Sequence, residues 1–118
     1  MRKVLVVDDS PVVRSFHMNI LKAAGFAVEG AADGIDALEK ALSSQYDLIL
    51  CDINMPNMDG LTFVRHYRDE EKETPIILIT TQEDSVHRAQ GFEAGANVFI
   101  VKPVKPKTLI YHISMLVR

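Results

Sequence analysis

Four short apolar runs in this chain are each followed at once by polar residues, and this repeat limits the fold more than any other feature. The runs are residues 4–7 before Asp8-Asp9, 48–51 before Asp52, 76–79 before Thr80-Thr81, and 98–101 before Lys102-Pro103. Apolar runs without polar alternation are typical of strands buried on both faces, as in a parallel sheet covered by helices. Because parallel strands point the same way, their C-terminal ends meet at one edge, where open α/β sheets bind ligands. We therefore expect these polar residues to form one site.

Length and composition predict one compact domain over residues 1–118. The 118 residues are 47% hydrophobic and 25% charged, as is usual for a globular protein with a packed core. A formal net charge of -3 supplies no basic field for a phosphate backbone, so we expect no direct nucleic-acid binding. The one cysteine, Cys51, lies in an apolar run, which fits a buried thiol in a reducing cytosol. With no signal peptide and no run long enough to insert into a membrane, the sequence predicts a cytoplasmic protein.

Strand and helix signals alternate along the chain. The predicted strands begin near Val4, Phe26, Leu48, Ile76 and Val98, and each interval leaves room for a helical crossover. The predicted helices cover residues 11–24, 34–43, 59–69, 83–91 and 106–117, the first with Ser10 as N-cap, Pro11 at its first position and Gly25 after its end. Right-handed crossovers then predict an α/β doubly wound fold, a five-stranded parallel sheet of order 2-1-3-4-5 with helices on both faces.

Three carboxylates, those of Asp8, Asp9 and Asp52, would meet at the C-terminal edge of this sheet. At a separation of several ångströms their repulsion raises their pKa values or demands a cation. Lys102 offsets one of the three charges, and Mg²⁺ would neutralise the other two. The alternative for Asp8 and Asp9 is helix capping, but Ser10 already provides that cap. The charges therefore favour a metal site.

Asp52 is the candidate reactive group, because it ends a buried run and its carboxylate would project from the strand tip. A carboxylate beside Mg²⁺ can attack a phosphoryl group and form an aspartyl phosphate, while Lys102 and Thr80 hold the equatorial oxygens. Simpler structural roles are also open for Thr80, Thr81 and Lys102. Thr80 and Thr81 could form an N-cap, with Thr81 and Asp84 spaced as a capping box, and Lys102 could merely neutralise the acids.

In order and spacing, these residues resemble the receiver domains of two-component response regulators, specifically the chemotaxis-type, CheY-like single-domain members. The resemblance spans essentially the whole chain. The residues that carry it are Asp8-Asp9, Asp52 with Asn54-Met55-Pro56 and Asp59-Gly60, Thr80, Phe99, and Lys102-Pro103. It implies the flavodoxin-like, CheY-like (βα)5 fold.

The resemblance implies a metal site and a phosphoacceptor. Asp52 would accept the phosphoryl group. Asp9, Asp52 and the backbone carbonyl of Asn54 would bind Mg²⁺ directly, with Mn²⁺ as an alternative ion, and Asp8 would act through a metal-bound water.

The resemblance also implies a phosphate pocket. Lys102 would contact a phosphoryl oxygen, with Thr81 and Pro103 beside it, and the Lys102-Pro103 bond would be cis, an isomer of low cost only in X-Pro bonds. Thr81 replaces the usual Ala, Ser or Gly, so its bulk could hinder a water or a phosphatase. Asn54 and Gln82 could help to orient a water, and these residues are expected to tune the phosphoryl lifetime.

Phosphorylation would replace a charge of about -1 with one near -2, so a nearby hydroxyl gains a hydrogen bond by moving inward. By resemblance, that hydroxyl belongs to Thr80, and Phe99 then rotates inward and repacks the face formed by the fourth helix, fifth strand and fifth helix. The alternative is a permanently buried ring, because Phe lacks the hydroxyl of the commoner Tyr. The candidates for the partner surface are Val104, which replaces a frequent Phe, Tyr111 and Met115.

Three functions stay open: a phosphorylation-switched receiver that controls a downstream protein, a Mg²⁺-dependent phosphohydrolase with Asp52 as nucleophile, and an inert interaction module. A hydrolase would need a second acid near Asp52 and a substrate cap, but Asn54 fills the nearest position. An inert module would tolerate loss of the acids, which are all present. The sequence therefore favours the receiver, which is not a turnover enzyme.

The chain's histidines show neither metal-ligand spacing nor a phosphorelay pattern, and we expect surface or interface roles for them. They are His17, His66, His87 and His112. The phosphoryl donor would be a separate histidine kinase or phosphotransfer protein, or a small-molecule phosphodonor. A phosphatase is a further candidate partner, and both a monomer and an activation-linked dimer fit the sequence.

Overall fold

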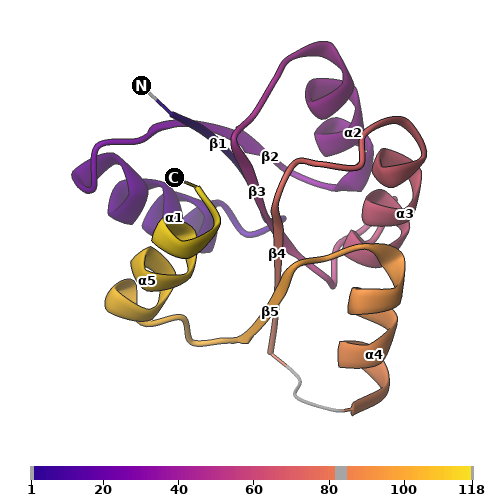
Figure 1. The fold of residues 1–118 in the computed structure, drawn as a ribbon. Coiled ribbons are helices and arrows are strands. Elements are labelled where there is room, and N and C mark those ends of the chain that lie inside the picture. Colours follow the sequence, from indigo (N-terminus) through magenta and orange to yellow (C-terminus); the bar gives the residue numbers. More distant parts are fainter. Residues whose placement is uncertain (1, 82–84, 118) are drawn as a thin grey trace.

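The computed structural model describes residues 2–81 and 85–117, and it confirms the predicted sheet. Within these described residues, five parallel strands lie in the order β2-β1-β3-β4-β5 (Figure 1). They are β1 (Lys3–Val7), β2 (Ala27–Ala31), β3 (Leu48–Asp52), β4 (Ile76–Thr80) and β5 (Val98–Val101). Asp8, Asp9, Asp52, Thr80 and Lys102 therefore lie at or just after strand ends at one edge of the sheet.

In the part of the chain that the structure describes, five helices alternate with the strands, with α1 and α5 on one face of the sheet and α2, α3 and α4 on the other (Figure 1). They are α1 (Pro11–Ala23), α2 (Gly34–Ser43), α3 (Gly60–Glu70), α4 (Ser85–Ala94) and α5 (Pro106–Leu116). The hydroxyl of Ser10 accepts a hydrogen bond from the Val13 amide, so the predicted N-cap of the first helix is confirmed. Within residues 2–81 and 85–117, no helix is long and apolar enough to cross a membrane.

The fourth helix differs from its prediction, because it continues past Gly91 to Ala94. A Cβ at Gly91 would lie 3.2 Å from a methyl carbon of Leu78 and 3.3 Å from the ring of Phe99, so this glycine serves close packing inside the helix. The residue that follows the helix is Gly95, whose φ of +121° favours glycine. The predicted start of this helix lies outside the described residues.

The apolar runs owe their lack of polar alternation to burial on both sides of the sheet. Leu5, Ile49 and Leu78 belong to the core under α2, α3 and α4, whereas Val6 and Leu50 belong to the core under α1 and α5. Strands β3 and β4 are buried along their whole length. The central strands are thereby fixed rigidly, and so are the residues at their ends.

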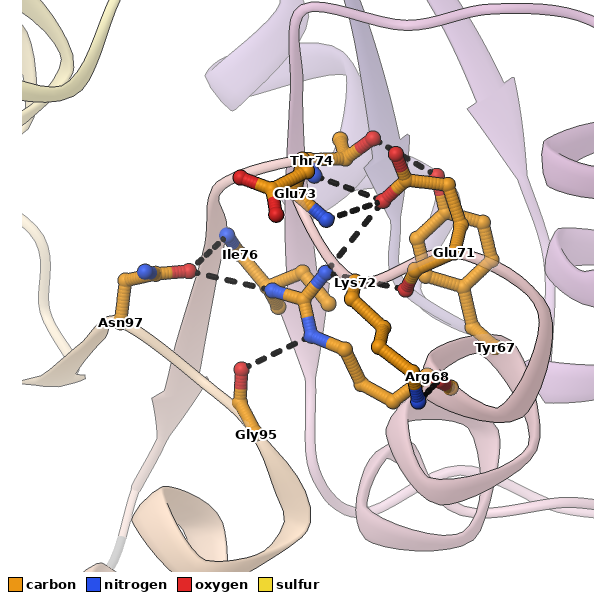
Figure 2. Close-up of polar contacts among 9 residues, drawn as sticks. All are labelled: Tyr67, Arg68, Glu71, Lys72, Glu73, Thr74, Ile76, Gly95 and Asn97. Atoms are coloured by element: carbon orange, nitrogen blue, oxygen red, sulfur yellow. Dashed lines mark hydrogen bonds and ion pairs between the residues drawn. The ribbon is translucent and has the colours of Figure 1, made fainter.

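A polar network centred on Arg68 of α3 closes the opposite, N-terminal edge of the sheet (Figure 2). The Nε atom of Arg68 donates to the Gly95 carbonyl at 3.0 Å, and its Nη2 donates to Oδ1 of Asn97 at 3.2 Å. The same Asn97 oxygen accepts from the Ile76 amide at 2.8 Å, and Glu71 forms an ion pair with Arg68 at 3.6 Å. Thus α3, the start of β4 and the turn between α4 and β5 are joined at the edge away from the acids.

Candidate functional site

The carboxylates of Asp8, Asp9 and Asp52 lie together at the C-terminal edge of the sheet. One oxygen from each lies within 4.8 Å of the others. Strands β1 and β3 are neighbours, with Val7 opposite Cys51, so the residues that follow in register are Asp8 and Asp52. Asp8 and Asp52 are buried and Asp9 is exposed, which gives the cluster one side open to solvent.

Lys102 reaches this cluster from the end of β5. Its Nζ lies 3.1 Å from Oδ2 of Asp8 and 3.5 Å from Oδ2 of Asp52. Burial raises the pKa of Asp52 from 3.8 to about 6; the charge of Lys102 opposes this rise, and the charge of Asp8 adds to it. One ammonium against three carboxylates leaves the site short of positive charge, and oxygen ligands of this kind suit Mg²⁺.

The loop after Asp52 is held by backbone hydrogen bonds and by a close approach at Gly60 that only glycine permits. The amide of Ile53 donates to the Ile79 carbonyl at 3.0 Å, and the amide of Gly60 donates to the Ile53 carbonyl at 2.8 Å. A Cβ at Gly60 would lie 2.2 Å from the carbonyl oxygen of Asp52, which is far inside van der Waals contact. The start of α3 therefore packs directly on the backbone of the candidate reactive residue, with Asp59 as its N-cap.

The two residues expected to switch occupy adjoining strands. Thr80 is buried at the end of β4, and its carbonyl accepts a hydrogen bond from the Lys102 amide at 2.6 Å. Phe99 on β5 is buried against Gly91, with the guanidinium carbon of Arg88 lying 5.2 Å from the centre of its ring. The ring is therefore in an inward position, under a cation from α4.

Of the remaining residues predicted for the pocket, the structure describes Asn54, Thr81 and Pro103, which follow β3, β4 and β5 at this edge of the sheet. Asn54 and Thr81 are exposed, each just after a strand of the site. Pro103 is exposed, and the Lys102-Pro103 bond is cis, as the resemblance implied. Gln82 lies outside the described residues.

The predicted partner surface needs one correction. Tyr111 and Met115 on α5 are 62% and 51% exposed, as expected. Val104 is only 5% exposed, because it packs into the core under α1 and α5, and its side chain is not part of the surface.

Two residues of α1 were missed or misread from the sequence. Arg14 donates from Nη1 to the Asp8 carbonyl at 2.7 Å, and only its position one turn into a helix beside the acids could have indicated this. His17 was expected at a surface or an interface, yet it is 2% exposed, because it lies one turn before the core residue Leu21 on the inner face of α1. Burial lowers the pKa of His17, and the charge of Asp8 partly opposes this.

The chain matches the family model of the response regulator receiver domain over residues 4–114. It therefore belongs to the response regulator receiver domains, the phosphorelay modules of two-component signalling. The predicted family, fold and signalling function are confirmed.

Among solved structures, the chain is similar to the chemotaxis protein CheY4 of Vibrio cholerae, with a TM-score of 0.93, 41% identity and 98% of both chains covered. It is 40% identical to the transcriptional regulatory protein ResD of Bacillus subtilis and 35% identical to SrrA of Staphylococcus aureus, each over 98% of this chain. The chain spans 48% of the length of each of these two regulators. The single-domain organisation therefore stays a prediction.

Proposed function

We propose that this receiver accepts a phosphoryl group on Asp52 in a Mg²⁺-dependent reaction. The observation that supports this most strongly is the meeting of three carboxylates and one ammonium at the C-terminal edge of the sheet. Asp52 is buried at the end of the central strand β3, and its carboxylate forms an ion pair with Lys102 at 3.5 Å. The clustered oxygens fit a hard divalent ion, with Asp9 open to solvent where an ion can enter.

Each residue of the site has a separate role in the proposed phosphoryl transfer. Asp52 provides the attacking carboxylate oxygen, which forms a bond to phosphorus as the donor's leaving group departs. Lys102 provides positive charge where the phosphoryl oxygens gather, and Thr80 provides a hydroxyl. Bound Mg²⁺, held by Asp9, Asp52 and the Asn54 carbonyl with Asp8 behind a water, would supply the remaining neutralising charge.

The switch would begin with the new charge on Asp52. A phosphoryl group at this position attracts the Thr80 hydroxyl, and the movement of Thr80 changes the space beside Phe99. Rotation of the ring would break its contact with Arg88 and alter the face formed by α4, β5 and α5, where Tyr111 and Met115 are exposed. In this proposal, a histidine kinase or phosphotransfer protein donates the phosphoryl group, and a downstream protein target binds the altered face.

Intact-protein mass spectrometry after incubation with acetyl phosphate tests the proposal. We expect a gain of one phosphoryl group that requires Mg²⁺ and is lost in Asp52→Asn. Asp69→Asn, an exposed carboxylate on α3 away from the site, is the matched control and should be phosphorylated normally. No gain in a folded protein that binds Mg²⁺ would favour an unphosphorylated interaction module, and turnover of generic phosphate esters would favour a hydrolase.

A further inference from the structure

We propose that Arg14 is a positioning residue for the Mg²⁺ site, holding the Asp8 carbonyl so that the carboxylates of Asp8 and Asp9 keep their places. This inference rests on the proposed Mg²⁺-dependent function. It concerns a side chain that lies outside the acidic cluster and binds its backbone. Arg14 comes from α1, the helix that follows the two acids directly.

Every polar group of Asp8 has a fixed partner. Its amide donates to the Ala31 carbonyl at 3.1 Å, and its Oδ1 accepts from the Ser10 amide at 3.0 Å. Its Oδ2 accepts from Lys102 at 3.1 Å, and its carbonyl accepts from Nη1 of Arg14 at 2.7 Å. A bond to a charged donor is stronger than one between neutral groups, so Arg14 is the strongest restraint on the backbone here.

The carboxylate of Asp9 depends on that restraint. Among residues 2–81 and 85–117, it has no hydrogen-bond partner, and it is exposed. The Asp8 carbonyl and the Asp9 amide belong to one planar peptide unit, so a donor that fixes the carbonyl also fixes the direction in which Asp9 leaves the plane. Arg14 therefore orients a proposed metal ligand whose carboxylate accepts no hydrogen bond within the part of the chain that the structure describes.

The Arg14 side chain packs against Gly30 of the edge strand β2 on its way to the Asp8 carbonyl. A Cβ at Gly30 would lie 3.1 Å from Cδ and 3.3 Å from Nε of Arg14, and 3.2 Å from Sδ of Met18. These distances are tighter than ordinary contact, so a side chain here would press on the Arg14 stem. On its other side, the Gly30 carbonyl accepts a hydrogen bond from Lys40 at 2.6 Å, which fixes the strand beneath the arginine.

Charge alone predicts the opposite effect from positioning. A guanidinium near a cation site repels the incoming Mg²⁺, so an Arg14 that acted only through its charge would weaken metal binding. An Arg14 that orients the ligands strengthens binding, because outer partners of metal ligands commonly contribute about 10–100-fold in affinity. The sign of the change on removing the charge therefore separates the two roles.

The experiment measures the Mg²⁺ dissociation constant of the full chain by isothermal titration calorimetry. Arg14→Met keeps the apolar stem and removes the donor, and we expect the constant to rise about tenfold. Arg14→Lys keeps the charge but not the planar donor group, and a smaller rise is expected. Arg65→Met, an exposed arginine on α3, is the matched control and should bind as the parent protein does.

The outcomes are distinct. An unchanged or lower constant in folded Arg14→Met, or, should that variant not fold, an unchanged constant in Arg14→Lys, would overturn the positioning role. Gly30→Ala, which leaves the guanidinium in place but presses on its stem, should raise the constant by a smaller factor. If the parent protein itself does not bind Mg²⁺, the proposed function fails and this inference with it, whereas binding by the parent with no effect of Arg14 overturns the inference alone.

Discussion

Replacing Asp52 with asparagine should stabilise the metal-free protein at neutral and alkaline pH. Burial is the main cause that raises the pKa of Asp52 from 3.8 to about 6, so its ionised form is less favourable in the folded protein than in the unfolded chain. The destabilisation is absent at low pH, where both states are protonated, and fully present above about pH 6. At about 1.4 kcal/mol for each pKa unit, it amounts to about 3 kcal/mol.

Urea unfolding followed by circular dichroism, in EDTA at pH 4 and pH 8, measures this difference. The free energy of unfolding of Asp52→Asn should exceed that of the parent by less than about 1 kcal/mol at pH 4 and by about 3 kcal/mol at pH 8. The difference at pH 8 corresponds to a shift of the unfolding midpoint by roughly 1–3 M urea. Asp69→Asn should show no comparable pH-dependent gain. Equal midpoints at pH 8, or a less stable Asp52→Asn, would refute the reasoning, because the attraction of Lys102 would then outweigh burial.

Mg²⁺ should reduce the difference in free energy of unfolding between the parent and Asp52→Asn at pH 8. A ligand that binds only the folded state raises the free energy of unfolding, and the parent has the full set of carboxylates for the ion. The same unfolding experiment at pH 8 with saturating MgCl₂ in place of EDTA measures the change. An equal gain in both proteins would argue against Asp52 as a metal ligand.

Three further substitutions test other parts of the site. Gly60→Ala should destabilise the protein by about 1–3 kcal/mol in urea unfolding, because its Cβ would lie 2.2 Å from the Asp52 carbonyl oxygen; unchanged stability would show that α3 adapts freely. Lys102→Met should raise the pKa of Asp52 further in a carboxyl NMR titration, because the ammonium now lowers it; a lower pKa would contradict this. Thr81→Ala should shorten the half-life of the phosphoryl group by opening the pocket to water, and an equal or longer half-life would count against steric protection.

The fold was predictable because its signals are local and repeated. The runs at residues 4–7, 48–51, 76–79 and 98–101 lack polar alternation, and the structure buries them on both faces of the sheet. The residues after these runs had to meet once the strands were parallel, so the cluster of Asp8, Asp9 and Asp52 followed from topology.

The misread residues depend on contacts between distant segments, which no local pattern encodes. Gly91 resembles a helix end, yet it is a packing site for Phe99, and the helix ends near Gly95 instead. Val104 follows the strand end at Lys102-Pro103, where the sequence predicts a residue of the partner surface, but its side chain packs into the core beneath α1 and α5. Arg14 acts on a backbone carbonyl, and any polar surface helix carries such arginines, so its role required the three-dimensional structure.

The Arg68 network gives α4 a fixed end. The Nε atom of Arg68 donates to the Gly95 carbonyl directly after the helix, and the Arg68 side chain packs so closely on Gly95 that a Cβ there would lie 2.7 Å from it. A helix of 10 residues is about 15 Å long and behaves as a stiff rod. A displacement of about 1 Å at the Ser85 end would therefore turn α4 by about 4° around the end held at Gly95.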